Sequence, residues 1–257
     1  MITLDRGAVE RVVRDALTKH LLSPSWSGAA PLPSPSGRAP ATLPCLSGRE
    51  LAPLPSPSGR GERGEGQRPN LVVNVSARHA HVTQEDLERL FGNGHQLKPF
   101  KWLYQHGFFA AEETVTVIGP RQRIIQNLRI LGPCRDHSQV ELAFTDAVQL
   151  GLDIPVRKSG DHRDSPGCWM MGPAGMIRLE RGVIRHERHV HLGPSDADHF
   201  GVQDGDRLHL RVRSDCSAVL EDLLVRLSPT SKLEVHIDTD EGNAVNHPRA
   251  TNFELFK

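Results

Sequence analysis

Two short histidine motifs have the residue types and the spacing of a metal site. They are Arg78-His79-Ala80-His81 and Arg188-His189-Val190-His191. In a β-strand, residues i and i+2 project from the same face, so the two histidines of each motif can point at one ion. Neutral imidazoles suit zinc, and a third protein ligand would leave a fourth position open for water or substrate, as in catalytic zinc sites. The spacing therefore predicts two zinc sites capable of chemistry.

The two motifs belong to a longer repeat. The first copy continues to Asp86 and Phe91-Gly92, and the second continues to Asp196 and Phe200-Gly201 with one residue fewer before the Phe-Gly pair. The copies lie 110 residues apart. Chance could produce one His-x-His motif, but the matching downstream residues indicate that a half-domain has been duplicated.

Each histidine pair needs a third ligand, and the sequence offers several. Candidates are the carboxylates Glu112, Glu113 and Glu141 and the imidazole of His236, which lies in the β-type run 232–237. The alternative is that a His-x-His motif merely forms the exposed face of a strand edge. For one copy this alternative competes evenly with a metal site, but two copies and the additional histidine favour metal.

The arginine before each motif would project from the opposite face of its strand. We expect Arg78 and Arg188 to form salt bridges or surface contacts. The other histidines share no such pattern and are interpreted as surface or structural residues: His20, His95, His106, His137, His162, His186, His199, His209 and His247.

Short β-type runs separated by turn signals must position the two motifs. The runs are 71–75, 113–118, 124–131, 139–144, 176–179, 207–212 and 232–237. Brief helices are predicted at 83–91, 145–150 and 195–200, each after a polar cap and before a glycine. The pattern predicts a mainly β fold with short helices, built as two similar small β-barrel domains from a duplicated half. No Gly-rich phosphate loop occurs, and a doubly wound nucleotide-binding sheet is not expected.

The first 69 residues differ in composition from the rest. Apolar residues at 9, 12, 13, 16, 17 and 21 share one face of a predicted amphipathic helix over residues 1–22. Residues 23–69 are rich in Pro, Ser, Gly and Arg, which predicts a disordered linker. A helix on a long linker indicates that the helix targets the protein to a partner. Because the helix carries charges of both signs, binding to a membrane surface is less expected than binding to a protein.

Composition disfavours several other classes of protein. Lys plus Arg and Asp plus Glu each number 31, so no global basic surface points to nucleic acid. The four cysteines form no Cys-x-x-Cys pair, which disfavours a disulfide framework and favours a reducing cytoplasm. No apolar run approaches the ~20 residues that cross a bilayer. We therefore expect a cytoplasmic protein without nucleic-acid or membrane partners.

Five segments carry recognisable motifs in a fixed order: 73–81, 110–115, 139–141, 188–191 and 236–244. Together they resemble one known family, the PduL-type phosphotransacylases of bacterial microcompartments, or phosphate propanoyltransferases. The resemblance implies two β-barrel domains, two zinc ions at the domain interface, and conversion of acyl-coenzyme A plus phosphate to acyl phosphate plus coenzyme A. Many members carry an N-terminal peptide that directs them into a microcompartment. Residues 1–22 would then contact shell or lumen proteins.

The resemblance also implies roles for individual residues. One zinc ion would be held by His79, His81 and Glu141, the other by His189, His191 and His236, and phosphate would be bound by the catalytic residue Arg135. A guanidinium fork suits phosphate oxygens. The residues alone do not distinguish Glu141 from Glu112 or Glu113, because the choice rests on the family's carboxylate six residues beyond the arginine. Residues that contact coenzyme A are not indicated.

The expected domain boundaries are approximate. The first barrel would comprise residues 70–155 with part of the C-terminal segment, and the second residues 156–247, with strands free to exchange between them. A homo-oligomer is compatible with this plan. Neither the acyl chain, acetyl or propanoyl, nor the pathway served is specified by the sequence.

Two other functions compete with acyl transfer. A zinc hydrolase would activate water at the open coordination position and cleave acyl-coenzyme A or a phosphoester without phosphate. In a non-catalytic scaffold protein, zinc would have only a structural role and would hold the two barrels together. Within the transferase, an acyl-enzyme through Cys134 is conceivable because the neighbouring Arg135 would lower the thiol pKa, but a structural or incidental cysteine is favoured.

Overall fold

The computed structural model describes residues 70–257, and these are mainly β with a few short helices, as predicted. The predicted targeting helix at 1–22 and the predicted linker at 23–69 lie outside the described residues. Within residues 70–257, no helix has the length and apolar character needed to span a membrane.

The elements of the described residues are short. The strands are β1 Val72–Ser76, β2 His79–His81, β3 Pro99–Trp102, β4 Phe109–Ile118, β5 Ile124–Gly132, β6 Gln139–Glu141, β7 Val156–Arg157, β8 Cys168–Met171, β9 Met176–Leu179, β10 Val183–His186, β11 His189–Leu192, β12 Arg207–Arg213, β13 Ala218–Leu227, β14 Glu234–Asp238 and β15 Asn252–Phe256. The helices are α2 Gln84–Phe91, α3 Phe144–Leu150, α4 Pro194–Phe200, α5 Thr239–Ala244 and the 3₁₀ turn His247–Arg249.

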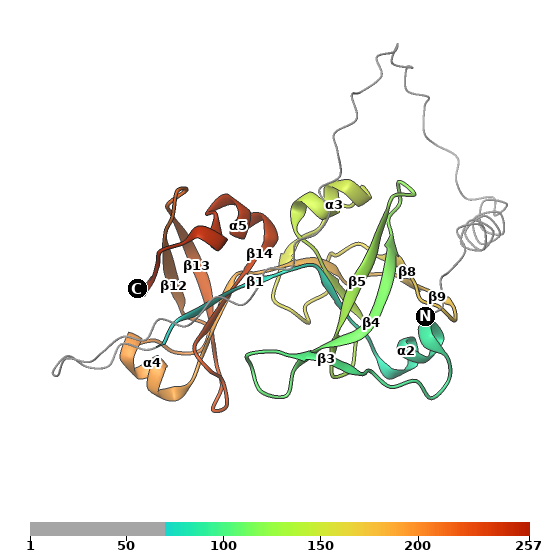
Figure 1. The fold of residues 1–257 in the computed structure, drawn as a ribbon, viewed down its shortest axis with the longest axis horizontal. Coiled ribbons are helices and arrows are strands. Elements are labelled where there is room, and N and C mark those ends of the chain that lie inside the picture. Colours follow the sequence, from blue (N-terminus) through green and yellow to red (C-terminus); the bar gives the residue numbers. More distant parts are fainter. Residues whose placement is uncertain (1–69) are drawn as a thin grey trace, which may run out of the picture. The chain divides into compact units, whose positions relative to one another are not determined.

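The strands form two curled sheets (Figure 1). The first has the order β7-β10-β6-β2-β5-β4-β8-β9, with β3 paired to β4, and the second has the order β1-β14-β11-β13-β12-β15. Each sheet covers its own apolar core, which includes Ile130 and Met170 in the first and Leu210 and Val235 in the second. The two partial barrels therefore fold around separate cores.

The helices predicted at 83–91, 145–150 and 195–200 form as α2, α3 and α4, whereas α5 and the 3₁₀ turn were not predicted. The polar caps predicted for α3 and α4 are wrong, because Ala143 and Gly193 occupy their N-cap positions. The side chain of Thr83 caps α2 by accepting a hydrogen bond from the Asp86 amide at 3.0 Å. α3 and α4 end at Gly151 and Gly201, which adopt left-handed conformations with φ of 80° and 61°. Glycine adopts these angles without steric cost, so both helices stop there.

The strand before each histidine motif pairs in the opposite sheet. β1 precedes the first motif, yet it runs parallel to β14 with Asn74 opposite His236. β10 precedes the second motif, yet it runs parallel to β6 with Ile184 opposite Glu141. The chain therefore crosses between the sheets just before each motif, and this reciprocal exchange ties the two motifs to one another.

Because of this exchange, the boundaries between the two barrels differ from those expected from the sequence. We expected the second barrel to begin at residue 156, but β7 to β10 belong to the first sheet. The second sheet also continues past residue 247, because β15 pairs with β12. Strands as short as β7, with two residues, and β8, with four, cannot display a recognisable period of two.

A matched ion pair lies behind each histidine motif. Arg78 contacts Asp146 at 2.7 Å, and Arg188 contacts Glu241 at 2.7 Å, which confirms the salt bridges expected of these arginines. Asp146 and Glu241 occupy the first turns of α3 and α5, the helices that follow β6 and β14. Each pair therefore fixes a histidine strand to the element that follows its third candidate ligand.

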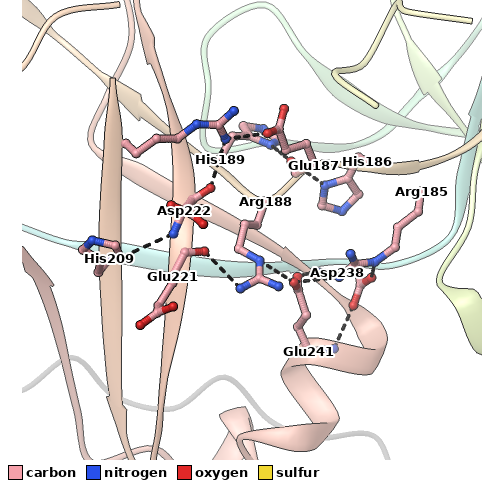
Figure 2. A network of polar contacts seen from close by, with 11 residues as sticks. Arg185, His186, Glu187, Arg188, His189, His209, Glu221, Asp222, Asp238 and Glu241 are labelled. Carbon is pink, nitrogen blue, oxygen red and sulfur yellow. Dashed lines mark hydrogen bonds and ion pairs between the residues drawn. The ribbon is translucent and has the colours of Figure 1, made fainter. Parts of the chain in front are cut away.

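The second of these pairs belongs to a buried network that joins the two sheets (Figure 2). Arg185 of β10 contacts Asp238 and also reaches Glu241 at 2.6 Å. Asp238 and Glu241 cap α5 reciprocally through their side chains and backbone amides. Arg185 lies in the first sheet, whereas Asp238 ends β14 of the second and Glu241 lies in the helix that follows it, so the network holds the sheets together.

Removing the shared carboxylate should destabilise the protein strongly. In Glu241→Gln, Arg188 loses its ion pair and Arg185 loses one of two, so the free energy of unfolding should fall by about 3–5 kcal/mol. Urea unfolding followed by circular dichroism measures the difference. The control Glu180→Gln breaks the exposed pair with Arg178 and should cost about 0–1 kcal/mol. Equal losses in the two variants would contradict this account of the network.

Candidate metal centre

The first candidate cluster lies where β2 and β6 pair antiparallel. His79 is opposite Glu141, and His81 is opposite Gln139. The candidate ligand atoms of His79, His81 and Glu141 all lie within 4.8 Å of one another. The Nε2 atoms of the two imidazoles lie 3.4 and 3.8 Å from the Glu141 carboxylate. These distances exceed those of good hydrogen bonds and leave room for a cation between the three groups.

The second candidate cluster repeats this arrangement in the other sheet. β11 and β14 pair antiparallel with His189 opposite His236, so His236 occupies the place that Glu141 has in the first sheet. The candidate ligand atoms of His189, His191 and His236 lie within 4.8 Å of one another, and the ring centroids are 4.9 to 5.2 Å apart. The structure thus brings together both predicted sets of three residues.

The first histidine of each motif is oriented in the same way. The Nδ1 atom of His79 is 2.8 Å from the carbonyl oxygen of Ala77, and that of His189 is 2.8 Å from the carbonyl oxygen of Glu187. A carbonyl can only accept, so each Nδ1 carries the proton and each Nε2 offers a lone pair. Hydrogen bonds of this kind typically orient histidines that bind metals. The duplication therefore extends to the groups that support the candidate ligands.

Burial keeps the imidazoles in the form that binds cations. It lowers the pKa of His81 to about 3 and that of His191 to about 4. Burial also lowers the pKa values of His79 and His189. All four are therefore neutral at pH 7, with lone pairs available to a metal ion.

Glu141 is held as a carboxylate. Burial alone would raise its pKa, but the charges that His79, His186 and His81 carry when protonated, together with a hydrogen bond from Ser159, hold the pKa well below its usual range. One oxygen, Oε1, accepts from Ser159 at 2.7 Å and from Gln139 at 2.5 Å. The other, Oε2, faces His79. The carboxylate is thus anchored on one side and open to a cation on the other.

Arg135 adjoins the first cluster through Ser159. Its guanidinium donates to the Ser159 hydroxyl at 2.9 Å, and Ser159 in turn donates to Glu141. The guanidinium is partly desolvated, which lowers the pKa of Arg135, while Glu141 opposes that effect. The predicted phosphate-binding residue and the predicted carboxylate ligand therefore share one hydroxyl partner. Sequence reasoning missed Ser159, because a lone serine in a loop carries no signal.

His186 lies between the two clusters, although we interpreted it as a surface or structural residue. It is buried, its ring centroid is 5.7 Å from that of His189, and its charge would lower the pKa values of both His79 and Glu141. Its Nε2 has no hydrogen-bond partner among residues 70–257. His186 ends β10 as Ser76 ends β1, three residues before the motif in each copy. The two clusters therefore adjoin through β10.

The other candidate carboxylates lie elsewhere. Glu113 contacts the His95 ring at 2.8 Å and accepts from the Lys98 amide at 3.0 Å, and Glu112 is exposed. The strand register explains why Glu141 is the carboxylate that contacts the histidines, because it lies directly opposite His79.

The Cys134 thiol is not activated as a nucleophile, because burial, together with Glu113, raises its pKa.

The donor sets fit zinc. Two imidazoles with one carboxylate, and three imidazoles, are both ligand sets that zinc accepts. Three protein ligands per ion leave a fourth position for substrate, whereas structural zinc sites are usually closed by four. The arrangement can therefore polarise a carbonyl or stabilise a thiolate beside a bound anion.

Comparisons with known proteins agree with this chemistry. Residues 72–248 match the model of a family described as phosphate propanoyltransferase. The chain is 54% identical over 256 residues to the phosphate propanoyltransferase of Planctopirus limnophila, covering 99% of this chain and 92% of that one. It is 47% identical over 179 residues to the enzyme of that name from Thermotoga maritima, covering 69% and 85% of the two chains. The corresponding protein of Salmonella typhimurium is 42% identical over 179 residues, covering 69% of this chain and 84% of that one.

Proposed function

The chain belongs to the phosphate propanoyltransferase family and is an acyltransferase, and we propose that it transfers a short acyl group from coenzyme A to phosphate at the paired clusters. The observation that carries this proposal is the convergence of two three-residue clusters with the guanidinium of Arg135. Three-residue clusters suit ions that must also meet a substrate. A guanidinium beside them suits an oxyanion.

We propose that each of the two clusters binds one zinc ion. His79, His81 and Glu141 would hold one, and His189, His191 and His236 the other. When bound, zinc supplies Lewis acidity for the thioester carbonyl and for the departing thiolate. His79, His81 and Glu141 are buried, which strengthens the electrostatic interactions within the first cluster.

The residues around the clusters would hold the phosphate for attack. Arg135 binds and orients it, and Ser159 fixes the guanidinium relative to Glu141. A phosphate oxygen then forms a bond to the acyl carbon while the carbon–sulfur bond breaks, giving acyl phosphate and the coenzyme A thiolate. No side-chain nucleophile is required, in keeping with the raised pKa of Cys134.

The acyl group is proposed to be short. The relatives above are named for propanoyl transfer, and acetyl differs from propanoyl by a single methylene, which an apolar pocket distinguishes by only about 10- to 200-fold.

We further propose that residues 1–22 target the protein to shell or lumen proteins of a microcompartment. The alignment with the Planctopirus limnophila protein spans 99% of this chain, so it includes most of that segment.

Phosphate dependence separates this proposal from the competing hydrolase. Zinc-loaded protein should release free thiol from propanoyl- or acetyl-coenzyme A only when phosphate is supplied, as measured with a thiol-reactive dye. Sulfate at equal ionic strength is the control, because it resembles phosphate but gives no stable acyl product. Thiol release without phosphate would instead support the competing hydrolase function. No release at all with metal bound would support the scaffold.

A further inference from the structure

A second arginine faces the paired clusters from the second sheet. Arg226 lies in β13, and its partner in the parallel register with β11 is His191. Residues paired across neighbouring strands project from the same face of a sheet. The Arg226 guanidinium is therefore on the face of the second sheet that carries the histidine cluster.

This guanidinium has no close partner in residues 70–257. Arg185 and Arg188 contact Glu241 at 2.6 and 2.7 Å, but within residues 70–257 no hydrogen bond or ion pair involves the side chain of Arg226. Desolvation lowers the pKa of Arg226, and the charges of Glu141 and Asp204 oppose that effect. A half-buried arginine without a paired carboxylate is costly unless an anion completes its environment.

The guanidinium groups of Arg135, in the loop between β5 and β6, and of Arg226, in β13, act on the same carboxylate, and neither forms an ion pair within residues 70–257. Glu141 is the main opposing charge for both Arg135 and Arg226, and the charge of Arg226 in turn lowers the pKa of Arg135. Arg226 also lowers the pKa values of His189 and His191. Glu141 is the one carboxylate among the six candidate ligands, and two guanidinium groups act on it. Glu234 lies opposite His191 and 3.2 Å from His236, and Asp204 also acts on Arg226. Two bound zinc ions would add more positive charge than these carboxylates offset, which favours an anionic ligand here.

We infer that Arg226 binds the phosphate substrate together with Arg135, so that Arg226 of β13 and Arg135 of the loop between β5 and β6 both contact the anion between the two clusters. This inference rests on the proposed function, in which phosphate accepts the acyl group. The reacting thioester is neutral, so it does not satisfy the two guanidinium groups. Inorganic phosphate is multiply charged and offers several oxygens, so it can accept from both forks at once.

Direct binding of inorganic phosphate to the zinc-loaded full-length protein tests the inference. Calorimetric titration without acyl-coenzyme A should give a dissociation constant about 10- to 100-fold higher for Arg226→Ala than for the wild type, the usual loss for a charge-assisted hydrogen bond. Arg226→Lys should lie between them, because a point charge replaces the fork. Arg213→Ala, which removes an exposed arginine from the same sheet, should bind phosphate as the wild type does.

Steady-state kinetics provides the second readout. In Arg226→Ala the KM for phosphate should rise while the KM for acyl-coenzyme A and the metal content stay unchanged. An unchanged phosphate affinity overturns the inference, and so does a rise confined to the KM for acyl-coenzyme A, which would assign Arg226 to the coenzyme's own phosphates. Loss of bound metal from the variant would make the role structural and also overturn it. If the wild type binds phosphate through Arg226 but releases no thiol, the proposed function fails and the inference stands.

Discussion

Replacing His79 or His189 with alanine should lower phosphate-dependent thiol release by more than about 100-fold. Loss of a group that merely supports a metal ligand typically costs 10- to 100-fold in metal affinity or activity, and loss of a ligand itself should cost more. The two histidines are equivalent by duplication, since each donates its Nδ1 proton to a carbonyl oxygen two residues upstream. Turnover measured at saturating phosphate and acyl-coenzyme A tests this expectation.

Metal analysis sharpens this prediction. Because each histidine belongs to its own cluster, each variant should lose about one equivalent of zinc and keep the other. His199→Ala removes an exposed histidine of α4 and serves as the control, with unchanged metal content and rate. Full activity in either ligand variant would remove that cluster from the active centre. Full metal content with lost activity would show that the histidine acts as something other than a ligand.

Replacing Arg135 with alanine should lower kcat/KM for phosphate by about 10²- to 10³-fold, as expected when a fixed donor to a reacting oxyanion is removed. Ser159 holds the guanidinium in place at 2.9 Å, so the free enzyme already has it oriented for the anion. Metal content should not change, because Arg135 is not a ligand. Steady-state kinetics at varied phosphate, with metal analysis of the same samples, measures both quantities.

Two variants separate the charge of Arg135 from its shape. Arg135→Lys keeps the positive charge but loses the bidentate fork, and it should recover part of the activity. Arg123→Ala removes an exposed arginine near the start of β5 and should behave as the wild type. A loss in Arg135→Ala that appears wholly in the KM for acyl-coenzyme A would contradict phosphate binding by this residue.

The histidine pairs could be predicted from sequence because they are local. His79 with His81, and His189 with His191, are two residues apart in single strands, and alternation alone places each pair on one face. Their duplication supplied a second independent signal. The capped helices were equally local, since Thr83 and the terminal glycines act within one turn. Local patterns of this kind can be recognised in the sequence without knowledge of the tertiary structure.

The third candidate ligands depend on strand register, which the residues alone do not specify. Glu141 meets His79 because β6 runs antiparallel to β2, and Glu113, equally plausible in sequence, instead contacts His95. Only the family resemblance separated these carboxylates in advance. The exchange of β1 and β10 is likewise a long-range pairing, between strands whose own residues are compatible with either sheet.

The residues that support the site were the hardest to foresee. His186 and Arg226 acquire their positions through pairing with another strand, and neither belongs to a recognisable motif. Arg226 also breaks the duplication. In the first sheet, β5 takes the place of β13, and the residue following the pair Ala80–Ile130 is Leu131. A comparison of the two halves therefore gave no reason to single out this arginine.

The central claim is that the acyl group leaves coenzyme A for phosphate at the paired clusters, and product stoichiometry tests it most directly. Zinc-loaded wild-type protein would be given propanoyl-coenzyme A and phosphate, with acyl phosphate trapped as the hydroxamate and free thiol counted in the same sample. We predict equal amounts of the two products, and neither in the absence of phosphate. Thiol without matching acyl phosphate would mean that water receives the acyl group, and the transferase mechanism proposed for this site would be wrong.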